Sequence, residues 1–326
     1  MQDVHAQLAS AGLRVDGELE VGRLVRCPVE GDSGRKRSGW YVLHELRLDS
    51  GELVLVGRYG NWRAGTPLSG LAVEFEAGGL SDEERRRMKE AAQQARERAI
   101  EEKRERAEQA AARAANIWPK LPESGKSEYL QRKGVRAYGV RFTRGSIVVP
   151  VRNGDGDLLG LQWIGPGGDK TFLTGTPKQA CFHLIGEVGA DVGVLGIAEG
   201  YATAAEVHEV VGWPVAVAFD AGNLLPVARV LRSLHPDIEI VLLGDRDEGK
   251  TPGWGCYACG WFVQARLGER ENPRYQEPAA CPECGRADTG SCGPGEVKAS
   301  AAARYVAGRV VIPDFSVTQQ QGEDAA

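Results

Sequence analysis

Residues 81–117 lie in the longest stretch of the chain without glycine or proline, and this feature constrains the fold most strongly. The segment reads SDEERRRMKEAAQQARERAIEEKRERAEQAAARAANI and consists mostly of strong helix formers. Ser81 followed by Glu84 is the capping-box pattern of a helix start. Apolar residues are too few for a continuous heptad seam. We therefore predict one long, charged, solvent-exposed helix that separates the regions on either side of it.

Residues 1–80 contain short apolar runs, such as YVLHELRL and ELVLVGRYG, which are interrupted by glycine and by Asp-Ser-Gly. Short apolar runs between turn residues are typical of strands, so we predict a small β-rich domain. Cys27 has no partner at metal-ligand spacing, and core packing is its expected role. The basic loop Gly31–Arg37 either contacts phosphates or forms a plain surface turn.

Residues 118–186 carry ten basic and five acidic side chains. The run SIVVPVRNGDGDLLGLQWIG predicts two strands joined by an Asn-Gly-Asp-Gly turn, and we predict a basic α+β subdomain here. The following residues, 187–326, carry 20 acidic and 11 basic side chains, a balance of −9. Such an asymmetry is expected where one part holds a polyanion and the other holds cations. A chance distribution of surface charge explains it about equally well.

Residues 187–315 alternate between apolar runs of strand length and helical patterns. VGVLGIAEG, PVAVAFD and IEIVLLGDRD read as strands, and the segments between them read as helices. This alternation predicts a parallel sheet with helices on its faces, which is an α/β fold. Ligands bind such sheets beyond the carboxyl ends of the strands, where Glu199, Asp245 and Asp247 stand.

These three acids indicate a metal site. Carboxylates at one edge repel one another unless a cation or a shared proton neutralises them. Oxygen ligands suit Mg²⁺ or Mn²⁺, and the chemistry of such a site is phosphoryl or nucleotidyl transfer. The alternative is a structural βαβ unit whose acids are only exposed to solvent.

The order strand, Glu-Gly, helix, strand, helix, strand, Asp-x-Asp, here IAEGYATA and LLGDRDEG, resembles the Toprim domain of bacterial-type primases, topoisomerases, recombination mediators and certain nucleases. With AVAFDAGNLLPVA between them, these motifs are similar to Toprim primases of phages and mobile elements. The runs SEYLQRKGV, SIVVPVRNGDGDLLGLQ and DKTFLTGTPKQACFHLIG resemble the basic subdomain that precedes Toprim in those primases. The resemblance covers about residues 118–315.

The resemblance also implies roles for individual residues. Glu199 would be the acid/base or metal-linked carboxylate, and Asp245 and Asp247 would bind Mg²⁺ or Mn²⁺. The side chains that would face template or nucleotide phosphates are basic: Lys170, Lys178, Arg132, Lys133 and Arg141.

Four cysteines form two close pairs in an insertion at residues 253–294. The pattern Cys256-x2-Cys259, 21 intervening residues, then Cys281-x2-Cys284 is the spacing of a zinc ribbon. Four thiolates leave no open position, so we predict a structural Zn²⁺ that folds an insertion too short to form its own core. Two alternatives remain, namely Cys292 replacing one ligand and disulfide pairing.

The resemblance implies a DNA primase that synthesises short RNA primers on single-stranded DNA. Its expected partners are the template, nucleoside triphosphates and a separate replicative helicase. The alternatives are a Toprim nuclease and a non-catalytic DNA-binding replication accessory.

The chain has no run of about 18 uncharged apolar residues and no signal-peptide pattern at its start. We therefore expect no membrane partner and a cytoplasmic location. Residues 316–326, which include QQQGEDAA, are expected to form a disordered tail.

Overall fold

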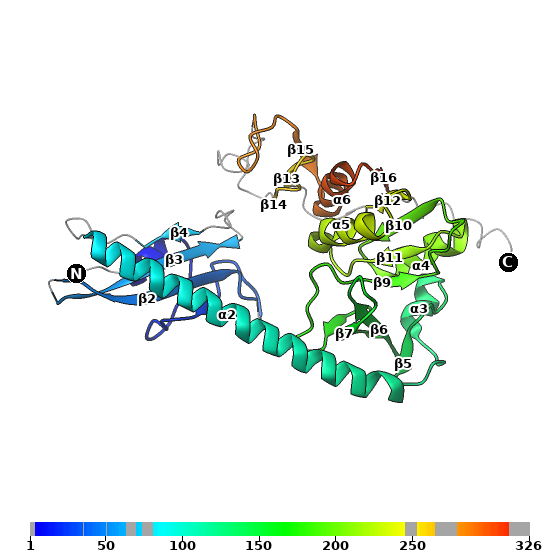
Figure 1. Cartoon of the computed structure of the whole chain (residues 1–326), viewed down its shortest axis with the longest axis horizontal. Coiled ribbons are helices and arrows are strands. Elements are labelled where there is room, and N and C mark those ends of the chain that lie inside the picture. The colour runs from blue at the N-terminus through cyan, green and yellow to red at the C-terminus, as the bar shows by residue number, and fades with distance from the viewer. Residues whose placement is uncertain are drawn as a thin grey trace. The chain divides into compact units, whose positions relative to one another are not determined.

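The structure is a computed structural model, and it describes residues 4–34, 36–49, 51–62, 70–73, 81–244, 253–264 and 279–312. The chain divides into two compact units, Met1–Arg104 and Glu105–Ala326. The boundary lies inside helix α2 (Asp82–Ile117), drawn in cyan in Figure 1. The predicted long helix is therefore present. The domain boundaries predicted at residues 80, 117 and 186 do not coincide with this division into two units, and they stay predictions.

The first unit contains a short helix and a four-stranded antiparallel sheet in the order β1-β2-β3-β4. The two longest strands, each of nine residues, coincide with the apolar runs YVLHELRL and ELVLVGRYG. The elements are α1 (Val4–Ser10), β1 (Leu24–Cys27), β2 (Gly39–Arg47), β3 (Leu53–Asn61) and β4 (Leu71–Ala72).

Successive residues of a strand point to opposite faces of the sheet, and the two faces of this sheet are covered differently. On one face Tyr41 and Leu43 pack with Leu8 of α1 and with Cys27, which is buried as predicted. On the other face an apolar cluster of Leu46, Leu48, Val54 and Val56 packs against Met88 of α2.

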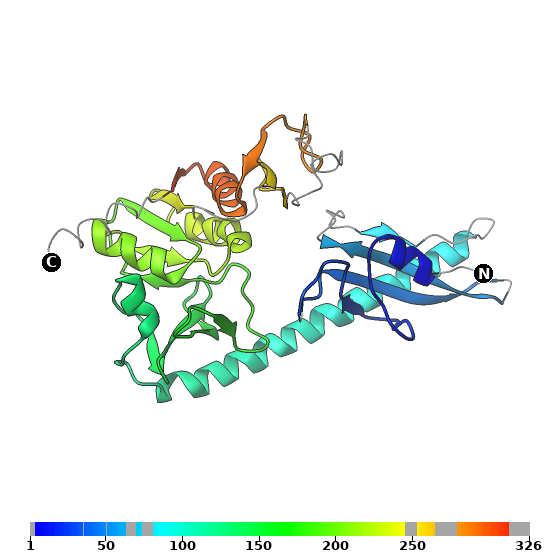
Figure 2. The ribbon, with the colours of Figure 1, turned by 180° about the vertical axis from the view of Figure 1, so that it is seen from behind.

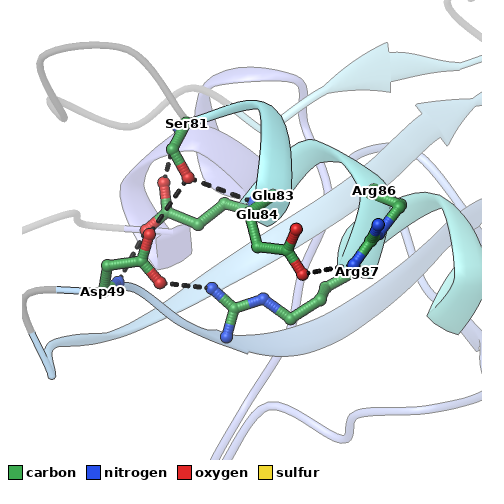
Figure 3. Close-up of polar contacts among 6 residues, drawn as sticks. All are labelled: Asp49, Ser81, Glu83, Glu84, Arg86 and Arg87. Carbon is green, nitrogen blue, oxygen red and sulfur yellow. Dashed lines mark hydrogen bonds and ion pairs between the residues drawn. The ribbon is translucent and has the colours of Figure 1, made fainter.

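The start of α2 is tied to the β2–β3 hairpin (Figure 3). The Glu84 N–H donates to Ser81 Oγ over 3.2 Å, and the Ser81 N–H donates to Glu84 Oε2 over 2.7 Å, which is the predicted capping box. The Asp49 N–H also donates to Glu84, and Arg87 Nη2 lies 2.5 Å from Asp49 Oδ1. The backbone N–H groups of Asp49 and Ser81 lower the pKa of the Glu84 carboxyl.

The second unit begins with the end of α2 and the turn η2 (Trp118–Lys120), followed by the sheet β5-β6-β7-β8. The predicted hairpin is present, because β6 and β7 pair antiparallel and Asn153 Oδ1 accepts from the N–H groups of Asp155 and Asp157 in the turn. Ala114 of α2 packs against Leu161 of this sheet. The elements are α3 (Glu128–Lys133), β5 (Arg141–Thr143), β6 (Ser146–Arg152), β7 (Leu158–Ile164) and β8 (Lys170–Phe172).

A five-stranded sheet forms the centre of the second unit, in the order β16-β12-β10-β11-β9. The first four strands are parallel and β9 runs antiparallel to β11, so the predicted α/β class with a parallel sheet is confirmed. The elements are β9 (His183–Ile185), β10 (Val194–Ala198), α4 (Tyr201–Val211), β11 (Val215–Val217), η3 (Ala221–Asn223), α5 (Leu224–Leu234), β12 (Glu239–Leu243), α6 (Pro294–Tyr305) and β16 (Arg309–Val311).

Both faces of this sheet are buried, and alternate residues separate them. Leu195 and Ile197 of β10 pack on the side of α5 and α6, whereas Ala198 packs on the side of α4 and the β5–β8 sheet. Figures 1 and 2 show these layers from opposite sides. Strand β9 belongs to this sheet, although the sequence placed its residues in the preceding basic subdomain.

The insertion between β12 and α6 forms a small antiparallel sheet in the order β14-β13-β15, beside α6 in Figure 1. Tyr257 Oη donates to Glu296 Oε1 of α6 over 3.5 Å. The strands are β13 (Gly253–Cys256), β14 (Phe262–Gln264) and β15 (Thr289–Cys292). Among the described residues, no helix is both long enough and apolar enough to cross a membrane.

Candidate functional site

The carboxyl edge of the parallel sheet carries the first candidate side chain. Ala198 is paired with Val217 of β11 and with Leu243 of β12, so these three strands end level with one another. Glu199 follows β10 directly and therefore stands at the middle of this edge. Asp245 and Asp247, the other two predicted carboxylates, lie outside the described residues.

Lys170 of β8 reaches the same edge. A Cβ atom added to Gly200 would lie 3.5 Å from Lys170 Nζ, so the ammonium group lies beside the residue that follows Glu199. The β5–β8 sheet and the parallel sheet share one apolar core, and this packing brings a lysine from the basic region to the acidic edge. An ammonium group held here attracts phosphate oxygens and offsets the repulsion between carboxylates.

Lys178 is also held near this edge, by an ion pair with Asp220, a residue that the sequence analysis did not single out. Its Nζ lies 2.8 Å from Asp220 Oδ2, just beyond the end of β11. The same ammonium group lies 5.4 Å from the ring centroid of Phe172, which packs edge-on against Phe219 at 5.8 Å. Asp220 was visible in the sequence as the last residue of the run PVAVAFD, but only its charge distinguished it there.

The buried side-chain amide of Asn223 connects the loop that contains Lys178 with the turn that contains Asp220. Asn223 is 4% exposed, and its Nδ2 donates to the carbonyl oxygens of Ala218 at 2.8 Å and Cys181 at 2.9 Å. Its Oδ1 accepts from the N–H of Ala180 at 2.8 Å. One side chain therefore joins the loop that carries Lys178 to the turn that carries Asp220.

The two segments joined by Asn223 both contain strained backbone. Ala180 has φ 62° and Phe219 has φ 71°, in the left-handed region that costs L-residues about 1–2 kcal/mol each. Such strain persists only where surrounding contacts over-determine the conformation, and it gathers at functional sites. The Asn223 hydrogen bonds supply that determination next to the candidate site.

The remaining predicted basic residues have other contacts. Arg141 donates to the carbonyl oxygens of Trp118 and Leu121 and pairs with Glu123 at 2.7 Å, and only 17% of its side chain is exposed. Its guanidinium therefore ties β5 to the segment after α2. Arg132 donates to the Pro166 carbonyl at 2.8 Å, and Lys133 is exposed at the end of α3. The phosphate-binding roles of these three residues stay predictions.

The four predicted cysteine ligands do come together. Their sulfur atoms all lie within 4.8 Å of one another. The Cys256 and Cys284 sulfurs are 3.7 Å apart, and those of Cys259 and Cys281 are 3.6 Å apart. Cys292 is not in this group and donates instead to the Gly290 carbonyl at 3.3 Å.

Both cysteine pairs are held by the same backbone geometry. The N–H of Gly260 donates to the Cys256 carbonyl, and the N–H of Gly285 donates to the Cys281 carbonyl, each over 2.8 Å. Both glycines have positive φ, 76° and 72°, which a side chain would oppose. The repeated Cys-x-x-Cys-Gly sequence thus forms two equivalent turns that present their sulfurs to one point.

The thiol groups respond to this arrangement in different ways. Burial raises the pKa of Cys259 to about 12 and also raises that of Cys281. The backbone N–H of Arg286 lowers the pKa of Cys284. Four thiolates at this spacing are therefore unfavourable near neutral pH unless a cation neutralises them, which is the donor chemistry of a metal centre.

Two curated proteins of Escherichia coli, both named DNA primase TraC, are similar to this chain. One is 33% identical over 252 residues, which are 73% of this chain and 17% of that protein. The other is 32% identical over 244 residues, which are 71% of this chain and 22% of that protein. The chain thus spans about a fifth of the length of these relatives. No family model matches the chain.

Solved primase structures give weaker matches. The primase fragment of the bacteriophage T7 primase-helicase protein aligns with 37% of this chain and 51% of its own, at 16% identity and a TM-score of 0.27. The DnaG catalytic core aligns with 42% of this chain and 56% of its own, at 16% identity and a TM-score of 0.24. Both TM-scores are low, so neither likeness supports a statement about the fold.

The TraC proteins confirm the resemblance that the motifs indicated, and the chain is related to proteins named DNA primase.

Proposed function

We propose that this chain acts as a DNA primase, joining ribonucleotides into short primers on single-stranded DNA by metal-dependent nucleotidyl transfer. The observation that carries the proposal is the position of Glu199 at the carboxyl edge of a parallel sheet, directly before Gly200, which lies beside the Lys170 ammonium group. The relation to DNA primase TraC supports the choice of this reaction over others that the same carboxylates could perform.

The parallel part of the sheet corresponds in this proposal to a Toprim domain of the phage or mobile-element type. Glu199 follows the central strand β10, and the Asp245-Arg246-Asp247 motif follows β12, the neighbour of β10, in the sequence. We assign Glu199, Asp245 and Asp247 as the residues that would hold Mg²⁺ or Mn²⁺, since carboxylate oxygens are the ligands these ions prefer. The bound ions would neutralise charge on the attacking and leaving oxygens.

The chain's own basic residues would position the polyanionic reactants. Lys170 and Lys178 would bind nucleotide or template phosphates at the edge of the sheet, with Arg132, Lys133 and Arg141 as further contacts. Lys178 forms an ion pair with Asp220, so a phosphate would have to replace a carboxylate as its partner. Such an exchange keeps the ammonium group neutralised before and after binding.

We assign Zn²⁺ to the four cysteines. Sulfur ligands at about 2.3 Å from a tetrahedral Zn²⁺ are about 3.8 Å apart, close to the observed 3.7 and 3.6 Å. All four positions are filled by protein, so the role is structural: the ion would fold the β13–β15 insertion.

The partners that follow from this function are a single-stranded DNA template, nucleoside triphosphates and a separate replicative helicase. The cytoplasm is the corresponding location.

The test is primer synthesis on single-stranded DNA with labelled ribonucleotides and Mg²⁺ or Mn²⁺. We expect short labelled oligomers from the wild-type chain and none from Glu199→Gln or from Asp245→Ala with Asp247→Ala. A parallel reaction with labelled template DNA, run on the same gel, distinguishes a primase from a nuclease and from a non-catalytic accessory. A cut template without oligomers would indicate a nuclease, and an intact template without oligomers would indicate a non-catalytic accessory.

A further inference from the structure

Among the described residues of the first unit, one face of the sheet is only partly covered. Strand register places on this face the alternate residues of the four strands, and Met88 of α2 covers the cluster at one end of it. The other end carries Trp40 and Arg26, which are opposite one another on β2 and β1. Trp62, directly after β3, joins them there.

Trp40 is seated firmly on this face. It is 8% exposed, and its ring lies over Gly60, the residue paired with it on β3. A Cβ atom on Gly60 would come within 2.7 Å of Trp40 Nε1, and one on Gly70 within 2.5 Å of the ring, so glycine at both positions makes the slot for the indole. The buried indole N–H has no hydrogen-bond acceptor among the described residues.

Trp62 lies next to the buried Trp40 ring and faces solvent. It is 41% exposed, and its ring centroid lies 6.1 Å from that of Trp40 at an interplanar angle of 34°. The Arg26 guanidinium stacks on it, with Cζ 3.9 Å from the ring centroid. Arg26 is also anchored by a hydrogen bond from Nε to the Arg37 carbonyl at 3.0 Å, next to the exposed basic residues Lys36 and Arg37.

The described strand positions on this face carry charge of one sign. The strand positions that share it include two arginines, Arg26 and Arg58, and no carboxylate; Glu45 points to the opposite face. The full set in the four described strands is Leu24, Arg26, Trp40, Val42, His44, Leu46, Val54, Val56, Arg58, Gly60 and Ala72.

We propose that this face, defined by Arg26, Trp40 and Trp62, binds single-stranded DNA. A base would stack on the exposed Trp62 ring, and the arginines would bind phosphates of the backbone. Exposed aromatic rings interleaved with basic side chains are the means by which proteins hold single strands without sequence preference. Among the described strand positions and Trp62, this face offers an exposed indole and two arginines but no acid, and such a surface complements a flexible polyanion better than it complements a protein of mixed charge. The inference rests on the proposed function, which requires a template.

The test measures template affinity of the full chain by fluorescence anisotropy with labelled oligodeoxythymidine and no nucleotides. One stacked base contributes enough for Trp62→Ala to weaken binding about tenfold, and Arg26→Gln should have a similar effect. Trp62→Phe keeps an aromatic ring and should retain most of the affinity. Retention by Trp62→Phe and loss by Trp62→Ala together separate stacking from misfolding.

A matched pair on the second unit provides the control. Arg229 Cζ lies 4.1 Å from the ring centroid of Tyr305, which is 62% exposed. Tyr305→Ala and Arg229→Gln remove the same kind of contact and should bind as the wild type does. Wild-type affinity in both Trp62→Ala and Arg26→Gln would overturn the proposal and leave this face to a protein partner. Equal losses in the control pair would overturn it as well, because the effect would then not belong to this face.

Glu199→Gln separates this inference from the proposed function. It should abolish primer synthesis and leave oligodeoxythymidine affinity unchanged. If wild-type chain binds the oligomer through Trp62 but makes no primer, the surface stands and the primase proposal fails.

Discussion

The two main sheets of this protein carry their chemistry in different places. In the part of the chain that the structure describes, the antiparallel sheet of the first unit leaves part of one face open, and Arg26, Trp40 and Trp62 stand on that face. The parallel sheet of the second unit is covered on both faces, so its polar residues gather at the edge where β10, β11 and β12 end. An antiparallel sheet can expose a face, whereas a sheet in βαβ units has mainly its edge to offer.

We expect the largest effect from loss of a cysteine ligand, which should unfold the β13–β15 insertion while the rest of the second unit stays folded. If the four cysteines bind Zn²⁺ as we propose, Cys256→Ser should lower the zinc content from about one ion per chain to none, because structural zinc contributes roughly 10 kcal/mol or more to folding a small site. Metal analysis and hydrogen exchange would show unprotected β13 and β15 with the five-stranded sheet intact. Cys292→Ser is the control and should keep its zinc. Loss of protection in both sheets would mean that the insertion and the parallel sheet fold as one.

The second prediction tests whether the carboxyl edge of the parallel sheet affects catalysis independently of the Trp62 face. Lys170→Ala should lower the rate of primer synthesis about a hundredfold, the size of effect found when one electrostatic contact at a reacting centre is removed. Lys126→Ala, an exposed lysine in the same basic region, is the control and should retain the wild-type rate. Affinity for oligodeoxythymidine should fall much less than in Trp62→Ala, since the Trp62 face is in the other unit. Equal rates for the two variants would remove Lys170 from the site.

The third prediction concerns the strained edge. Asn223→Ala leaves the N–H of Ala180 and two carbonyl groups without their partner, and should lower the free energy of unfolding by about 2–3 kcal/mol. Urea denaturation measures this. Asn116→Ala on the exposed surface of α2 should change it by less than about 0.5 kcal/mol. A small effect of Asn223→Ala would show that Ala180 and Phe219 keep their conformations by other means.

The smallest effect, per pH unit, is a pH dependence that His183 gives to the stability of the second unit. His183 is buried, and burial lowers its pKa from 6.5 to about 4. Between these values the unfolded chain binds a proton that the folded chain does not, so stability falls as the pH drops, by up to about 1.4 kcal/mol per pH unit. Thermal denaturation from pH 7 downward should show this slope, and His183→Gln should reduce it. His235→Gln, at the end of α5, is the control and should leave the slope in place.

Features encoded by neighbouring residues could be predicted from the sequence. The long helix follows from the composition of residues 81–117, and the four cysteine ligands follow from two short repeats with fixed spacing. The alternation of strands and helices predicted the parallel sheet and placed Glu199 at its edge. The resemblance implied that Lys170 and Lys178 face template or nucleotide phosphates, and that role stays a prediction. The structure places Lys170 Nζ near Gly200 and Lys178 Nζ near Asp220.

Features that depend on tertiary packing could not be predicted in this way. Asn223 is one polar residue in a helix start until the fold brings Ala180 and Cys181 to it. Strand register decides that Trp40 and Arg26 share a face, and a shift of one residue would separate them. The contacts of Arg141 with the segment 118–123 are a further example, because the resemblance implied only a phosphate contact, which stays a prediction.

Helix α2 has a consequence for synthesis of the chain on the ribosome. Its first turn is fixed by Ser81, Glu84 and Asp49, all of which emerge early, whereas Ala114 packs against strands that are translated later. Starting a helix is the costly step and extending it is not. The capped turn can therefore serve as a template from which the helix grows residue by residue as the chain is released. The second unit then begins to fold on an element that the first has already started.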